Sequence, residues 1–165
     1  MRPTFPYRRI NVVGTSASGK TTFARVLAAR LGVQHVELDA LHWQKDWTEA
    51  PTEVMRQRVE QAIAGPEWVV DGGYAIVRDI VWARAEAVVW LDFPLRTILW
   101  RYATRTRRRI RTQEELWPGT GNRESLSKHL LRDGLLWWIL STYRRRRRDY
   151  PGLLAGHPGL AAIRL

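Results

Sequence analysis

One segment of the chain has the residue types and the spacing of a phosphate-binding loop. Residues 14–21 read Gly-Thr-Ser-Ala-Ser-Gly-Lys-Thr, which is G-x-x-x-x-G-K-T with no position missing. Glycines let successive backbone N–H groups turn toward a polyphosphate, and a following helix N-terminus adds unsatisfied donors. Lys20 would reach the β- and γ-phosphates and Thr21 would offer its hydroxyl to Mg²⁺, so the motif predicts ATP and Mg²⁺ as cofactors. The residues predicted to bind them are Gly14, Thr15, Ser16, Ala17, Ser18, Gly19, Lys20, Thr21 and Thr22.

The segments on either side of this loop have the patterns of a strand and a helix. Residues 9–13 are mostly apolar and β-branched, and residues 22–31 have helical spacing that ends at Gly32. Strand, glycine loop and helix in this order form the context in which the motif binds phosphate. The alternative is an ordinary glycine-rich turn that opens a helix. Lysine scarcity argues against it, because the chain has 24 Arg and only three Lys, one of them at the position that the motif requires.

Length and composition indicate one cytoplasmic domain. A chain of 165 residues with 45% hydrophobic residues can bury a core, and we expect a single domain over residues 1–165. The absence of Cys excludes a disulfide framework, a thiolate metal site and a Cys nucleophile. No apolar stretch approaches the roughly 18 residues that cross a bilayer, and the short N-terminus does not resemble a signal peptide. We therefore expect no membrane association, and either a monomer or a homodimer.

Four further segments have the apolar character of buried strands, and they alternate with helical patterns. The predicted strands are residues 36–39, 68–71, 87–92 and 161–165, and the predicted helices are 52–64, 75–84, 95–111 and 124–148. Such alternation is typical of a parallel sheet with helices on both faces. The predicted class is therefore α/β, with a three-layer P-loop fold, a sheet of about five parallel strands and a helical lid.

Three aspartates follow predicted strands and should share the sheet edge at which such folds bind ligands. Asp71 precedes two glycines that let a ligand approach the backbone, which favours a role in Mg²⁺ binding over capping of a turn. Asp39 is assigned to the acceptor or the metal, with turn capping as the alternative. Asp92 precedes Phe93-Pro94, which resembles a helix entry, so a structural role is favoured there.

His42 and Trp43, which follow Asp39 in the sequence, are candidates for binding the substrate. His42 could contact the acceptor, although a loop histidine is more often a hydrogen-bonded bystander. Trp43, and Trp47 after it, could stack on a base, but tryptophans of this kind more often pack in a lid or a core.

Arginines gather at two places in this strongly basic chain, whose formal net charge is +11. Arg101 and Arg105 lie with Arg108 on one face of a predicted helix, where they could stabilise a transferring phosphoryl group. Arg107, Arg109 and Arg111 are expected to be solvated. Residues 144–148 are five consecutive arginines. They either offset the dipole at the C-terminus of a helix or form a surface stripe that binds nucleic-acid phosphates.

The segment after the arginine helix has loop chemistry. Residues 112–124 contain Pro, two Gly, Asn and Thr between two predicted helices. We expect a mobile lid over about residues 101–125, with Arg123 entering the site when the lid closes.

Together these segments resemble adenylate-kinase-like P-loop proteins, and in particular the group named "DNA topology modulation protein". The resemblance rests on residues 14–21, Leu38-Asp39 with His42-Trp43 nearby, residues 70–74, residues 89–92 and the arginine helix. It implies the five-stranded sheet of nucleoside monophosphate kinases. It also implies that Asp71 orients Mg²⁺ waters, that Arg101 and Arg105 are the arginines at the start of the lid, and that Arg78 binds the acceptor. Adenylate kinases carry Phe-Pro-Arg where this chain has Gly73-Tyr74-Ala75, which argues against AMP as the acceptor.

The sequence therefore predicts an ATP- and Mg²⁺-dependent phosphotransferase acting on a nucleotide or another small acceptor. The predicted catalytic residues are Lys20, Asp39, Arg101 and Arg105; the metal residues are Thr21 and Asp71; and the substrate residues are His42, Trp43, Arg78 and Arg123. The alternative is a nucleic-acid-associated ATP-binding protein, in which the positive charge binds DNA or RNA without sequence specificity.

Overall fold

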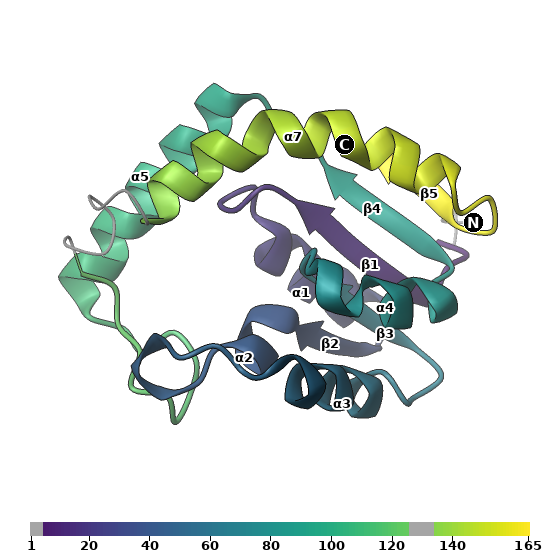
Figure 1. The fold of residues 1–165 in the computed structure, drawn as a ribbon, viewed down its shortest axis with the longest axis horizontal. Coiled ribbons are helices and arrows are strands. Elements are labelled where there is room, and N and C mark those ends of the chain that lie inside the picture. Colours follow the sequence, from purple (N-terminus) through teal and green to yellow (C-terminus); the bar gives the residue numbers. More distant parts are fainter. Residues whose placement is uncertain (1–4, 126–133) are drawn as a thin grey trace.

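The apolar, β-branched segments form a five-stranded parallel sheet in the computed structural model, which describes residues 5–125 and 134–165 (Figure 1). The strands are β1 (Arg9–Gly14), β2 (Gln34–Glu37), β3 (Trp68–Asp71), β4 (Ala87–Leu91) and β5 (Ala161–Arg164). They follow the order β2-β3-β1-β4-β5, with every neighbouring pair parallel. The most apolar strands, β1, β3 and β4, are therefore central, and both of their faces need to be covered.

Helices cover both faces of this sheet. The described helices are α1 (Lys20–Leu31), α2 (Leu38–His42), α3 (Thr52–Ala62), α4 (Arg78–Arg84), α5 (Leu95–Thr112) and α7 (Leu135–Ala155), with short 3₁₀ turns η1 (Lys45–Trp47) and η2 (Ala75–Val77). Of these, α5 extends away from the sheet and packs on α7 (Figure 1). Ala24 and Ala28 of α1 pack with β1, β3 and β4 on one face. Met55 and Val59 of α3 and Tyr150 of α7 pack on the other face. The predicted class, an α/β fold with three layers and five parallel strands, is confirmed.

Two predicted elements differ from the structure. β2 ends at Glu37, and Asp39 lies in the short helix α2 and not at a strand end, because Leu38 turns into the core and is only 1% exposed. The predicted helix 124–148 is wrong at both described ends. Residues 124–125 are not helical and residues 126–133 lie outside the described residues, while α7 continues through Pro151 to Ala155. Packing of Tyr150 against Trp90 of the sheet outweighs the local helix-breaking tendency of that proline.

The backbone turns sharply at Gly72, directly after β3. Its φ of +128° lies in the region that favours glycine, and an added Cβ would lie 2.8 Å from the buried Cβ of Leu38. Asn11 of β1 supports the same turn, because its side-chain amide donates to the carbonyl oxygens of Val70 and Gly72 at 3.2 Å each. The backbone directly after Asp71 is therefore fixed from two sides.

We expect Gly72→Ala to lower the free energy of unfolding by about 2–4 kcal/mol, from backbone strain and overpacking against Leu38. Urea denaturation followed by circular dichroism measures the change. Gly65→Ala is the matched control, because a Cβ at Gly65 would meet nothing within 4 Å. Equal stability of the two variants would contradict this account of the turn.

Candidate active site

The predicted phosphate-binding segment forms a curled loop between β1 and α1. Ala17 and Gly19 have left-handed φ values of 65° and 90°, and the Ser18 N–H donates to the Thr15 carbonyl at 3.0 Å. The Ser18 hydroxyl is buried without a hydrogen-bond partner among the described residues. Alternation of right- and left-handed residues makes a concave backbone that binds anions, and a buried hydroxyl can satisfy itself on the same ligand. The loop therefore fits a polyphosphate.

Lys20 begins α1 and folds back over this loop, where its ammonium donates to the Thr15 carbonyl at 3.1 Å. Burial lowers the pKa of Lys20 to about 8; the positive charges of Arg146 and Arg105 lower it further, and the carboxylates of Asp39 and Asp71 oppose the shift. A bound anion would favour the charged ammonium and restore the pKa. Lys20 thus lies in a site whose excess positive charge is suited to an anionic ligand.

Asp71 ends β3 directly beside the start of α1. Its Oδ1 accepts from the Thr21 hydroxyl at 3.0 Å, and its Oδ2 lies 2.6 Å from Nε2 of His35. The side chain of Asp71 is only 3% exposed. A hydroxyl and a carboxylate at this place are ligands that suit Mg²⁺ bound mainly through phosphates and water. No cluster of three or more metal-binding side chains occurs in residues 5–125 and 134–165.

Sequence reasoning missed His35, which orients Asp71 from the neighbouring strand. Strand β2 pairs with β3 in the register His35↔Val69 and Glu37↔Asp71. His35 precedes the predicted strand 36–39, and its contact with Asp71 depends on the pairing of two strands far apart in sequence, so the sequence carried no strong signal for it.

We expect Asp71→Asn to raise the Mg²⁺ concentration for half-maximal activity by about tenfold and to lower kcat, because an amide is a weaker ligand for the ion and its waters. A Mg²⁺ titration at saturating ATP measures this. Asp79→Asn is a suitable control, since Asp79 pairs with Arg56 on the surface and does not line the cleft. An unchanged Mg²⁺ dependence would remove Asp71 from the metal site.

Asp39 and His42 face the loop from the short helix α2. The Tyr74 hydroxyl donates to Oδ1 of Asp39 at 2.7 Å. Burial, followed by the charge of Asp39, strongly raises the pKa of Tyr74, so that Tyr74 remains a donor and leaves the other Asp39 oxygen for a ligand. The His42 ring packs on Trp43 and Tyr74, with centroids 4.9 and 4.6 Å away, and its Nδ1 is buried with no partner among the described residues.

Two arginines on different helices contact the loop backbone. Arg101 of α5 donates to the Ser18 carbonyl at 2.5 Å and lies over the ring of Phe93. Arg146 of α7 donates to the Gly14 carbonyl at 2.8 Å. Burial lowers the pKa of Arg146 and of Arg105, which also lines the cleft. Guanidinium groups buried at a loop of this shape are placed to meet phosphate oxygens.

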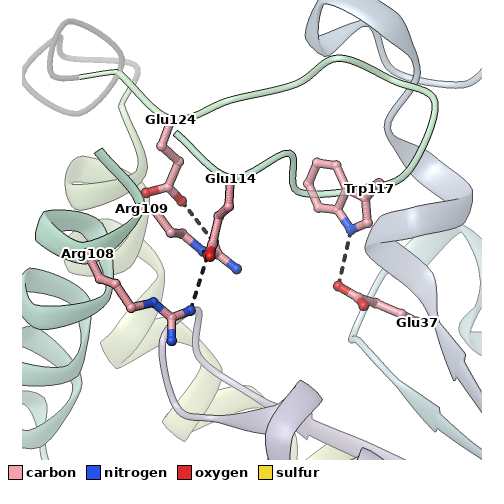
Figure 2. Close-up of polar contacts among 6 residues, drawn as sticks. All are labelled: Glu37, Arg108, Arg109, Glu114, Trp117 and Glu124. Atoms are coloured by element: carbon pink, nitrogen blue, oxygen red, sulfur yellow. Dashed lines mark hydrogen bonds and ion pairs between the residues drawn. The ribbon is translucent and has the colours of Figure 1, made fainter. Parts of the chain in front are cut away.

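Several other arginines form ion pairs with carboxylates. Arg147 lies 3.0 Å from Oδ1 of Asp92, and Arg164 pairs with the other oxygen of Asp92, so this aspartate has the structural role that was favoured. Arg109 was expected to be solvated, and this is wrong. It pairs with Glu114 at 3.3 Å and with Glu124 at 2.9 Å, because the chain after α5 folds back over it (Figure 2).

The segment 113–125 reaches from α5 across to the residues after α2 (Figure 1). Trp117 stacks on Trp43 with ring centroids 6.5 Å apart, and its indole N–H donates to Glu37 at 3.2 Å (Figure 2). The Asn122 amide donates to the Gln44 carbonyl, and its oxygen accepts from the N–H of Trp47. Trp43 and Trp47 therefore pack with the segment after the arginine helix, as was favoured for them.

One open cleft of about 2390 Å³ joins most of the predicted residues. Its lining contains residues 16–22 with Gly14, and also Asp39, His42, Trp43, Arg78, Arg101 and Arg105. Arg123 does not line it, because this exposed side chain donates to the Gln113 carbonyl on the outside of the segment. Asp71 and Thr15 lie just beneath the lining and are buried. Arg78 lines the cleft with its guanidinium over the ring of Trp82.

This combination of sheet order, glycine loop and flanking helices defines an α/β fold of the P-loop kinase type. The chain superposes on the crystal structure of a gluconokinase from Sinorhizobium meliloti 1021 with a TM-score of 0.54 and 21% sequence identity, covering 95% of this chain and 82% of that one. The unliganded structure of a sugar kinase from Janibacter sp. HTCC2649 gives a TM-score of 0.49 at 21% identity, with coverage of 97% and 85%. At these identities the likeness is one of fold. No protein-family model and no curated protein matched the sequence.

No helix in the described parts of the chain is both long enough and apolar enough to span a membrane.

Proposed function

We propose that the protein is an ATP- and Mg²⁺-dependent phosphotransferase that acts on a small-molecule acceptor. The observation that carries the proposal is the convergence of Lys20, Thr21 and Asp39 on one cleft that Arg105 and Arg146 also line, with the buried Asp71 held against the Thr21 hydroxyl. The gluconokinase that shares the fold is consistent with a kinase. Location in the cytoplasm and a monomeric or dimeric state stay predictions from the sequence.

Each residue of the cleft has a role in this reaction that follows from its position. Lys20 and the N–H groups of the glycine loop would hold the β- and γ-phosphates, and Thr21 and Asp71 would hold the metal. Arg101 fixes the loop through the Ser18 carbonyl. When bound, ATP with Mg²⁺ supplies the phosphoryl group and neutralises part of its charge. No covalent intermediate is required, since positioning and electrostatics suffice for phosphoryl transfer.

Asp39 would orient the acceptor, and Arg105 and Arg146 would stabilise charge that spreads onto the transferring group. The carboxylate of Asp39 has one oxygen engaged by Tyr74, so the second oxygen can accept a hydroxyl proton. His42 and Trp43 line the same part of the cleft.

We further propose that residues 101–125 act as the lid. The contacts of Trp117 and Asn122 with the residues after α2 support this, because they hold the segment over the cleft and would exclude water from a reactive phosphate. Arg123 would need the lid to rearrange in order to reach the site.

The nucleic-acid alternative finds one supporting feature, the exposed arginines Arg144, Arg145 and Arg148 on α7. It predicts duplex binding near physiological salt with a steep salt dependence that flattens when these three residues are replaced by alanine. Weak binding of duplex DNA or RNA by the unaltered protein at about 150 mM salt, close to the physiological ionic strength, would exclude this alternative.

The deciding experiment is a phosphotransfer panel with ATP and Mg²⁺, followed by ADP release. Acceptors include ribo- and deoxyribonucleoside monophosphates and hydroxylated metabolites, with the Lys20→Ala variant as the blank. Acceptor-dependent ADP release that disappears in the blank supports the proposal. ATP hydrolysis that no acceptor stimulates would contradict the proposal. The next experiment would then be the salt dependence of duplex binding.

A further inference from the structure

The charges that line the cleft are segregated by sign. Between positions 37 and 78 the lining carries three carboxylates and one guanidinium: Glu37, Asp39, Glu49 and Arg78. The opposite wall, from α5 and α7, carries seven arginines and one carboxylate: Arg101, Arg105, Arg108, Arg109, Arg145, Arg146, Arg148 and Asp149. Glu124, which also lines the cleft, pairs with Arg109. Burial raises the pKa of Glu37, but even with Glu37 protonated two carboxylates remain against one guanidinium. The arginine wall is suited to polyphosphate, and the other wall is not suited to a second anion.

The single guanidinium on the acidic wall belongs to Arg78. Arg78 begins α4, and its guanidinium lies over the ring of Trp82, 5.5 Å from the centroid. An acceptor that carried a phosphate or a carboxylate would find one cation here and would approach Asp39 and Glu49 against like charge. Such repulsion disfavours anionic acceptors in a partly desolvated site.

Aromatic rings form the rest of this wall. Trp43 and Trp117 are nearly parallel, with an interplanar angle of 18°, and Trp47 meets both rings edge-on at 5.7 and 5.8 Å. All three line the cleft. Indole faces beside carboxylates suit a ligand that has an apolar C–H face and a polar hydroxyl edge, because the face packs on the rings and the hydroxyls donate to the carboxylates.

His42 adds an independent sign of a missing ligand. The residue lines the cleft and is 6% exposed; its Nε2 lies 3.8 Å from Oε1 of Glu49, and its buried Nδ1 has no hydrogen-bond partner among the described residues. A buried polar atom without a partner costs about 1–3 kcal/mol, which a ligand hydroxyl can recover. His42 lies three residues after Asp39 in α2, so the two side chains are on one side of the helix.

We propose that the acceptor is a carbohydrate without phosphate or carboxylate groups, packed on Trp43 and Trp117 and hydrogen-bonded to Asp39 and His42. The inference rests on the proposed phosphotransfer function. In the transfer, the acceptor hydroxyl oxygen forms a bond to the γ-phosphorus of ATP. The bond from that phosphorus to the β,γ-bridging oxygen breaks, its electron pair leaves with ADP, and the hydroxyl proton passes to Asp39.

The first test compares acceptors by charge at equal concentrations. Neutral hexoses, pentoses and polyols form one group, and nucleoside monophosphates, sugar phosphates and aldonates form the other. We expect kcat/KM for the best neutral acceptor to exceed that of the best anionic one by at least about tenfold. Turnover confined to the anionic group would overturn this inference while leaving phosphotransfer intact. Turnover with neither group would remove the proposed function and this inference with it.

The second test removes one aromatic face. We expect Trp43→Ala to raise KM for the neutral acceptor about tenfold, with KM for ATP changed less than about twofold, and Trp43→Phe to restore most of the loss because it keeps a ring. Trp137→Ala is the matched control, since Trp137 is 57% exposed and does not line the cleft. A rise in KM for ATP with no change for the acceptor would place Trp43 at the nucleotide and overturn the assignment.

Discussion

Replacing Lys20 with alanine is expected to abolish acceptor-dependent ADP release, with a loss of at least about 1000-fold in kcat. The ammonium lies over the glycine loop, within the electrostatic influence of Asp39, Asp71, Arg105 and Arg146. Alanine removes the positive charge that would stabilise the β- and γ-phosphates in the transition state. Steady-state ADP release over a range of ATP concentrations measures the loss.

The matched control for this prediction is Lys45→Ala, because Lys45 is exposed and does not line the cleft. Its activity should remain within about twofold of the unaltered protein. Lys20→Ala should also keep the circular dichroism spectrum and the cooperative melting of the fold, since among the described residues the Lys20 side chain makes a single hydrogen bond, to the Thr15 carbonyl. Near-normal turnover by a folded Lys20→Ala protein would refute the assignment of this loop.

Replacing Arg146 with alanine is expected to lower kcat by about 100- to 1000-fold with a smaller change in KM for ATP. Its guanidinium is half-buried, donates to the Gly14 carbonyl at 2.8 Å and lies near Lys20 and Asp39. A cation at that place interacts most strongly when charge spreads over the transferring phosphoryl group, which is why kcat should fall more than binding. Single-turnover and steady-state measurements together separate the two effects.

Arg146→Lys and Arg144→Ala complete this experiment. The lysine variant keeps the charge but not the planar fork, so we expect it to recover only part of the rate. Arg144 is exposed on the same helix and does not line the cleft, so its replacement should leave activity within about twofold. An equal effect of Arg144→Ala and Arg146→Ala would mean that the cluster acts through its overall charge and not through one positioned side chain.

The glycine loop was predictable from the sequence because its chemistry is local. Gly14 to Thr21 are consecutive, and the strand before them and the helix after them have patterns that short-range physics fixes. The position of Asp71 at the ligand-binding edge of the sheet was predictable for a related reason. It ends an apolar strand before two glycines, and parallel strands bring their carboxyl ends to one edge of the sheet.

The contacts of the five arginines at residues 144–148 could not be predicted from the local sequence. Residues 144–148 look equivalent in the sequence, but successive residues of a helix point about 100° apart. Arg146 therefore reaches the loop and Arg147 reaches Asp92, whereas Arg144 remains exposed. Only the docking of α7 against the sheet, through Tyr150 on Trp90, sets which arginine faces the cleft.

The sequence by itself determined the class of fold, the glycine loop between β1 and α1, and the acidic residue that ends the neighbouring strand β3, because repeating patterns and consecutive motifs act through neighbouring bonds. The tertiary structure alone decided the pairing of His35 with Asp71 and the stacking of Trp117 on Trp43. It also decided the outward position of Arg123. Each of these depends on where one element comes to rest on another, and that position is set by packing over the whole core rather than by the residues on either side.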